Sequence, residues 1–98
     1  MIHARSDYNR IQDPATTNPK LLSIGSAPIA QDEPVMLFRA QDQLAPMVLL
    51  GYANLLMAHG AEEHMVDSVI RHATQMLQWQ SYHPSKRPPD MPRSTVTP

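Results

Sequence analysis

The stretch that decides the fold is Asp-Glu-Pro-Val-Met-Leu-Phe-Arg-Ala-Gln-Asp, residues 32–42. Its middle, from Val35 to Arg39, is a short apolar run of β-forming residues, and a long uncharged segment follows Asp42. A short apolar run, an acidic residue and then a helical pattern are typical of a strand followed by a helix. We therefore expect one short β-strand at residues 35–39 and a helix directly after Asp42.

The expected strand is apolar on both faces. Val35 and Leu37 point to one side, and Met36 and Phe38 point to the other. A strand of this kind is normally covered on both sides. It also needs a neighbour, and the candidates are residues 21–24 or the same strand of a second copy of the chain.

The first helix is expected from about Gln43 to His59. Asp42 suits the N-cap, and Gly60 suits the C-terminal stop. Pro46 falls in the first turn, where a missing N–H costs little. The helix interior has no charged residue and is apolar almost all round, which is typical of a helix buried on every side. In a chain this short, another subunit is the expected cover.

The second helix is expected from about Glu62 to Gln80. Its apolar residues recur at helical spacing along one side, at positions 65, 66, 69, 70, 73, 76 and 77. Only Gly60 and Ala61 separate the two helices, and so short a link favours an antiparallel hairpin.

The expected fold is therefore mainly α: an antiparallel helical hairpin with one short β-strand and an irregular N-terminal arm, in a homo-oligomer. The 98 residues allow one domain. Turn signals at residues 13–14 and 18–19 predict an irregular arm over residues 1–20. Residues 21–82 form the expected core, and the proline-rich residues 83–98 form a tail that we expect to be disordered.

Composition excludes several classes of protein. The chain has no cysteine, so it forms neither disulfides nor thiolate metal sites. Its net charge of -1 predicts no basic face for duplex nucleic acid. The longest uncharged apolar stretch, residues 44–58, is shorter than the ~20 residues that span a bilayer. The N-terminus is not of the signal-peptide type, and we expect a cytoplasmic protein without a membrane partner.

The residues that carry chemistry form no catalytic motif. His64 and His72 are eight positions apart, whereas metal ligands on one helix recur at i+3 or i+4. Ser68 lies in the middle of a helix without a nucleophile elbow. With three glycines in the chain, there is no glycine-rich phosphate loop. We predict no catalytic residue, no metal and no cofactor, and hence a protein that is not an enzyme.

Two polar clusters remain, Tyr-Asn-Arg-Ile-Gln-Asp-Pro at residues 8–14 and Arg-Ala-Gln-Asp at residues 39–42. Arginine is the preferred bidentate partner of phosphate, and an aromatic ring stacks on bases. The predicted ligand-binding residues are Tyr8, Arg10, Arg39 and Gln41, with Arg71 as an outside candidate. The alternative is structural: Asp13 caps a turn, Asp42 caps a helix and an arginine pairs with an aspartate.

The two motifs and the helical hairpin that follows them resemble a group of short, largely uncharacterised proteins encoded by tailed phages and prophages. The resemblance spans about residues 7–80. Those proteins have a shorter link before the Asp-Glu-Pro segment, so residues 16–30 look like an insertion. The resemblance implies a viral origin and the host cytoplasm, and it transfers no catalytic residue.

Three classes of function follow from this resemblance and from the lack of catalytic groups. The first is a phage accessory protein that counters host defence by sequestering a nucleotide-type signal in an intersubunit pocket. The second is a protein-interaction inhibitor of a host defence or regulatory protein. The third is a minor virion or assembly component.

Overall fold

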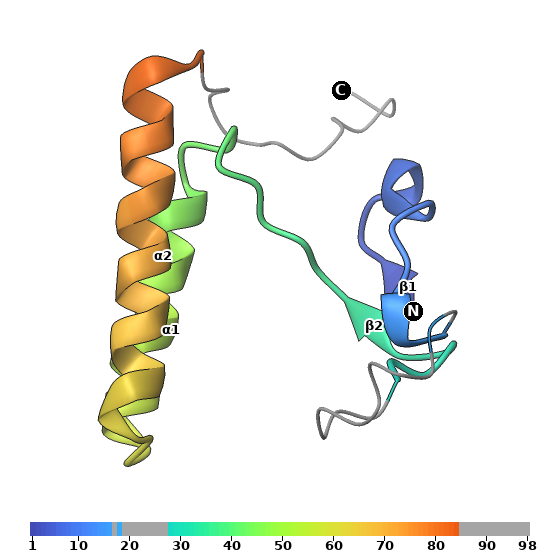
Figure 1. The fold of residues 1–98 in the computed structure, drawn as a ribbon, viewed down its shortest axis with the longest axis horizontal. Coiled ribbons are helices and arrows are strands. Elements are labelled where there is room, and N and C mark those ends of the chain that lie inside the picture. The colour runs from blue at the N-terminus through green and yellow to red at the C-terminus, as the bar shows by residue number, and fades with distance from the viewer. Residues whose placement is uncertain (17, 19–27, 85–98) are drawn as a thin grey trace, which may run out of the picture. The chain divides into compact units, whose positions relative to one another are not determined.

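The computed structural model describes residues 1–16, 18 and 28–84. The chain divides into two compact units, Met1–Leu37 and Phe38–Pro98 (Figure 1). This division falls inside the expected strand and differs from the expected boundary between an arm and a core at residue 20. Of the predicted tail, residues 85–98 lie outside the described part.

The first unit contains a small parallel sheet. Its strands are β1 (Ile2–His3) and β2 (Pro34–Val35), in the register Ile2 to Pro34 and His3 to Val35. The Ile2 N–H donates to Glu33 O at 2.8 Å. The N-terminal amine adds donations to the carbonyls of residues 30 and 31, at 2.7 and 2.8 Å. The sequence thus correctly predicts a strand at this place, but the partner is the start of the chain.

The strand is also shorter than expected. A strand extends only as far as its ladder partner, and β1 gives way after two residues to a bend and the 3₁₀ turn η1 (Ser6–Tyr8). Met36 and Leu37 follow β2 and are 53% and 42% exposed, so they are not covered on both sides as expected. The expected partner at residues 21–24 lies outside the described residues.

The N-terminal arm has more structure than expected. Besides β1, it forms η1 and a second 3₁₀ turn, η2 (Pro14–Thr16). Tyr8 is the centre of this unit, with only 5% of its surface exposed. The Arg5 guanidinium lies 4.4 Å from the centre of the Tyr8 ring and donates to its hydroxyl oxygen at 3.2 Å. The His3 ring meets Tyr8 edge-on, with 6.5 Å between the ring centres.

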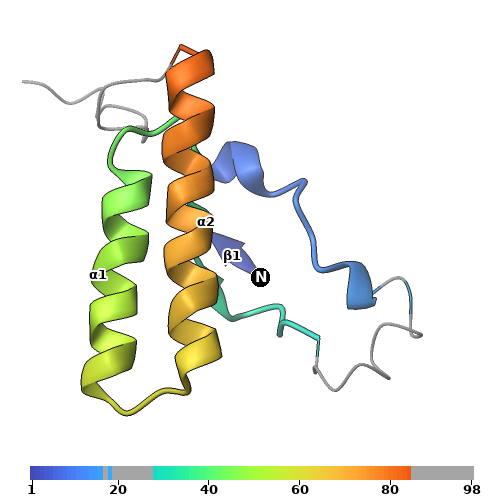
Figure 2. The same ribbon diagram turned by 60° about the vertical axis from the view of Figure 1, so that its left-hand side comes forward.

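The second unit is the predicted helical hairpin. Helices α1 (Ala45–Ala58) and α2 (Glu63–Tyr82) pack side by side along their length (Figure 2). The structure confirms a mainly helical fold, with α1 slightly shorter and α2 slightly longer at its C-terminus than expected. In the described part of the chain, no helix is both long enough and apolar enough to cross a membrane.

The start of α1 corrects one detail of the prediction. Leu44, not Asp42, occupies the N-cap position. The Asp42 carboxylate accepts the Leu44 N–H at 2.8 Å, and its carbonyl accepts the Ala45 N–H at 3.1 Å. Asp42 therefore closes the turn before the helix. Pro46 lies in the first helical turn as expected and is fully buried.

The end of α1 agrees with the prediction. Gly60 has a φ of +75°, a conformation that side chains with a Cβ rarely adopt. Its N–H donates to Met57 O at 3.1 Å, and the Ala61 N–H donates to Leu56 O at 2.9 Å. This pair of bonds is a Schellman motif, which satisfies carbonyls at the helix end. Gly60 thus ends α1 and allows the chain to reverse.

The seam between the helices is narrow and rich in small residues. In α2, Val66, Ala73 and Met76 are buried, and their separations of seven and three residues place them on one helix face. In α1, the buried residues are Ala45, Pro46 and Ala53. The predicted stripe of α2 is confirmed along its middle, but its edges at residues 65, 70 and 77 remain more than one-third exposed.

Candidate functional site

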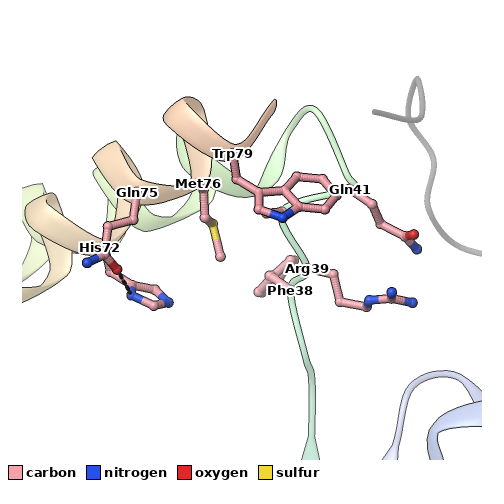
Figure 3. Close-up of a pocket in the computed structure, with 8 residues that line it drawn as sticks. Phe38, Arg39, Gln41, His72, Gln75, Met76 and Trp79 are labelled. Atoms are coloured by element: carbon pink, nitrogen blue, oxygen red, sulfur yellow. Dashed lines mark hydrogen bonds between the residues drawn. The ribbon is translucent and has the colours of Figure 1, made fainter. Parts of the chain in front are cut away.

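A cavity of about 400 Å³ lies at the open end of the hairpin, within the second unit. One wall is the segment Phe38–Gln41, which precedes α1, and the other wall is the last turns of α2 (Figure 3). The side chains from α2 are His72, Gln75, Met76 and Trp79. Figure 3 shows Met76 and Trp79 directed toward Phe38 and Arg39.

Gln80 fixes the first wall to the second. Its amide Nε2 donates to Ala40 O at 2.9 Å and to Asp42 O at 3.0 Å. The Asp42 N–H in turn donates to Arg39 O at 2.9 Å, closing a turn over residues 39–42. These bonds place Arg39 and Gln41 beside the cavity, because the backbone on both sides of Gln41 is held to α2.

The indole of Trp79 is held by its neighbour one helical turn later. The His83 ring stacks on it, with 4.1 Å between the ring centres and 10° between the planes. His83 Nδ1 also donates to Trp79 O at 3.0 Å, which holds the imidazole in place. One face of the indole is therefore covered, and its other face is not used by this stack. Among the described residues, no hydrogen bond uses the indole N–H of Trp79.

His72 and Gln75 form the polar side of the α2 wall. His72 Nδ1 donates to Gln75 Oε1 at 3.1 Å, as the dashed line in Figure 3 marks. This bond leaves His72 Nε2 and the Gln75 amide N–H groups for other partners. The wall thus combines a flat aromatic ring, a thioether and two polar side chains that can both donate and accept.

The structure brings two of the predicted ligand residues together. Arg39 and Gln41 line the same cavity. Arg71 does not line it: it is exposed on α2, and helical periodicity places it on the side opposite Ala73 and the seam. Arg10 is exposed in the first unit.

Tyr8 lies in a buried environment that does not suit base stacking. Stacking needs an exposed ring face, whereas the Tyr8 ring is buried and Arg5 lies over it. The physical reason is that the ring provides the only large buried side chain among the described residues of the first unit. Its contacts are those of a core residue.

The rest of the motif at residues 8–14 also makes internal contacts. His3 Nε2 donates to Ile11 O at 2.6 Å, and the Gln12 amide donates to Asn9 O. The two carboxylate oxygens of Asp13 accept the N–H groups of Ala15, at 3.0 Å, and Ile29, at 2.8 Å. This motif therefore supports the structural alternative.

Two carboxylates of the first unit are stabilised in their charged form. The backbone N–H groups of Ile29 and Ala15 lower the pKa of Asp13 below its ordinary value. The hydrogen bonds from the Arg5 guanidinium likewise lower the pKa of Asp7; Arg5 and Asp7 form a bidentate pair with contacts of 3.0 and 2.6 Å. Both effects strengthen local turns, and neither group lies in the second unit.

The predicted ligand-binding residues did not include Gln80, Trp79, His72 or Gln75. Gln80 had a detectable signal, because it continues the seam spacing 66, 69, 73 and 76 with a polar residue. The other three lie beside the apolar stripe of α2, where periodicity does not distinguish a cavity wall from a solvated face. Within the described residues, no three His, Asp or Glu side chains gather as a metal site would require.

Comparison with known proteins adds no relative. No family model matches the sequence, and neither the characterised proteins nor the solved structures contain a match.

Proposed function

We propose that this chain is a non-enzymatic binding protein that holds a small, planar, negatively charged ligand of nucleotide type. The observation that carries the proposal is that Arg39, Gln41 and Trp79 line one cavity. Its volume of about 400 Å³ lies in the range that small-molecule sites occupy. Gln80 supports the proposal because it holds the Arg39–Asp42 turn in place.

Each wall suits a different part of such a ligand. The Arg39 guanidinium provides paired donors for a phosphate. The indole face of Trp79 suits the flat face of a base, a contact worth ~1–3 kcal/mol per base. The amides of Gln41 and Gln75 can donate to and accept from the polar edge of that base.

The lining favours binding over catalysis. It includes no hydroxyl, thiol or carboxylate side chain, so the described cavity has neither a nucleophile nor a carboxylate base. His72 is the one titratable base in the wall, and its Nδ1 is engaged by Gln75. A ligand held by such a wall would be retained unchanged.

Retention without turnover suits a sequestering role. The two sequence motifs resemble those of short tailed-phage proteins, and a phage benefits from lowering the free concentration of a nucleotide immune signal of its host. We therefore propose a role in countering host defence in the host cytoplasm, with the Arg39–Trp79 cavity as the binding site.

A thermal-shift screen with cyclic and linear nucleotides tests the proposal. A ligand present at a hundredfold excess over its Kd should stabilise the protein by about 2.7 kcal/mol. Arg39→Gln should abolish the shift while the protein stays folded. Arg71→Gln removes the same charge from the same unit outside the cavity, and should leave the shift unchanged. No shift with any nucleotide would contradict the proposal.

A second groove favours a second candidate function. It has a volume of about 260 Å³ and lies between α1 and α2 near the hairpin link, lined by Tyr52, Leu56, His64, Met65, Ser68 and Val69. An apolar groove between two helices can take an anchor side chain of a protein partner. The test is a pull-down from host lysate with the wild type and with Met65→Glu. A host protein that binds through this groove should be retained by the wild type and not by Met65→Glu.

A further inference from the structure

The face of α1 that points away from α2 is apolar and exposed. Leu44, Val48, Gly51, Leu55 and Ala58 follow one line along it, at alternating four- and three-residue steps. Leu44 and Leu55 are 50% and 59% exposed. Helix α1 has no charged residue at any of its 14 positions. An uncharged stripe of this spacing is typical of a helix that packs against another helix.

The hairpin needs this face to be covered. Its two helices bury six residues, of which three are alanine or proline in α1 and one is alanine in α2. A core of that size is marginal without oligomerisation or another staple. Outside the described residues, the sequence of residues 85–98 contains only Met91 and Val96 as apolar side chains besides its prolines, and residues 19–27 contain one short apolar run, residues 21–24. Four extended residues reach at most ~14 Å, which is less than the ~21 Å between residues 44 and 58 of a helix. A second copy of the chain is present wherever the chain is made, and its α1 carries the same apolar face.

The stripe is complementary to itself when reversed. Gly51 lies at its middle, and a Cβ added there would meet nothing within 4 Å. Contacts within the described chain therefore do not explain a glycine inside a helix, where glycine is unfavourable. An antiparallel contact centred on Gly51 would place Leu44 against the partner's Ala58, and Val48 against the partner's Leu55. Both ends would then combine one larger and one smaller side chain.

We propose that two copies of the chain form an antiparallel dimer through this face of α1, with the two-fold axis beside Gly51. The contact is isologous, as in most homodimers. It brings no like charges together, and glycine lets the two backbones approach closely at the centre. None of the five stripe residues lines the Arg39–Trp79 cavity, so dimerisation and ligand binding are separate and can fail independently.

Sedimentation equilibrium of the full chain is the first test. A dimer has twice the 11.0 kDa mass of one chain, and its Tm rises with protein concentration because association stabilises the folded state. A monomer at high micromolar concentration, with a Tm independent of concentration, would overturn the proposal.

A charge exchange then tests the orientation. Leu55→Glu and Val48→Lys should each raise the dimer dissociation constant by ~100-fold or more, because each buries an unpaired charge. The double variant should recover much of the affinity, since an antiparallel contact sets each new lysine against the new glutamate of the partner. Gln78→Glu adds a charge on the outer side of α2 and should change nothing.

Two results of this exchange would reject the antiparallel dimer. One is a dimer that survives Leu55→Glu. The other is a double variant that keeps its helical circular dichroism but stays monomeric, because a parallel contact sets like charges together. A single variant that loses its helicity does not end the test. The proposal is supported if the double variant recovers both helicity and dimer mass. It is contradicted if the double variant recovers neither.

Discussion

The two units of this chain use their polar side chains in opposite ways. In Met1–Leu37, polar groups around a single buried ring bond to one another and to nearby backbone, as Arg5 and Asp13 do. In the hairpin, the helices satisfy the backbone and an apolar seam joins them. Polar residues beside that seam, such as Gln75, are not needed to hold the helices together. A polar cluster is thus structural in the first unit and lines a cavity in the second.

The largest expected effect is on the centre of the first unit. Tyr8→Ala should destabilise that unit by about 3–5 kcal/mol, the usual cost of truncating a buried aromatic residue. Amide hydrogen exchange should rise across residues 1–16 while α1 and α2 keep their protection. Tyr8→Phe keeps the ring and removes only the hydroxyl that accepts from Arg5, so it should cost about 0.5–1.5 kcal/mol. Unchanged exchange in Tyr8→Ala would show that the ring is not the core.

The corresponding change in the hairpin adds volume at the seam. Ala73 is 1% exposed, and Ala73→Leu should cost about 1–3 kcal/mol because a tightly packed site cannot accept the larger side chain without shifts. Urea denaturation followed by helical circular dichroism measures the loss. The next residue, Thr74, is exposed, and Thr74→Leu should leave the midpoint nearly unchanged. Equal effects from both variants would mean that the seam is not close-packed at Ala73.

The hairpin was predictable because its signals are local. The apolar spacing of α2 and the Gly60 stop lie within a few residues of the structure they determine. The pairing of β2 was not predictable, because its partner Ile2–His3 is a two-residue strand 32 positions earlier in the chain, with no strand pattern of its own. Local patterns predict elements better than they predict long-range partners.

The candidate site was predictable in part for the same reason. Arg39 and Gln41 stood out because they are polar residues next to an apolar run. Trp79 and His72 come from a helix 30 or more positions later, and only the hairpin geometry brings them to the same cavity. Tyr8 was included among the predicted ligand-binding residues because a tyrosine suits base stacking as well as core packing. The burial of the ring and the position of Arg5 over it distinguish the two in the structure.

Gln80 is a polar side chain of the hairpin that holds nearby backbone in place, as the polar side chains of the first unit do. Gln80→Leu removes two donations to the carbonyls of Ala40 and Asp42 and should cost about 1–2 kcal/mol. Gln80→Leu should also lower the affinity of the cavity for any nucleotide that it binds, because the turn that positions Arg39 is no longer held to α2. Gln78→Leu is the matched control: the same substitution on the exposed side of α2. If both variants bind and unfold alike, the two hydrogen bonds do not position the turn.

The smallest expected effect is the response of the first unit to acid. The folded-state pKa of Asp13 is lowered from its ordinary value of 3.8 by the N–H groups of Ile29 and Ala15. A lowered folded pKa means that the stabilisation is present above 3.8 and is lost as the pH falls through the lowered value. Asp13→Asn should therefore weaken the unit near neutral pH and reduce its further loss of stability in acid.

Two-dimensional amide NMR spectra recorded during an acid titration separate this effect from the hairpin. In the wild type, the signals of Asp13, Ala15, Ile29 and Ala30 should lose their dispersion before those of α1 and α2. Asp67→Asn, which changes an exposed carboxylate on α2, should leave that order intact. If Asp13→Asn keeps the wild-type acid response, the hydrogen bonds of Asp13 do not stabilise the unit. Its stability would then depend more on the buried ring of Tyr8 than on these hydrogen bonds.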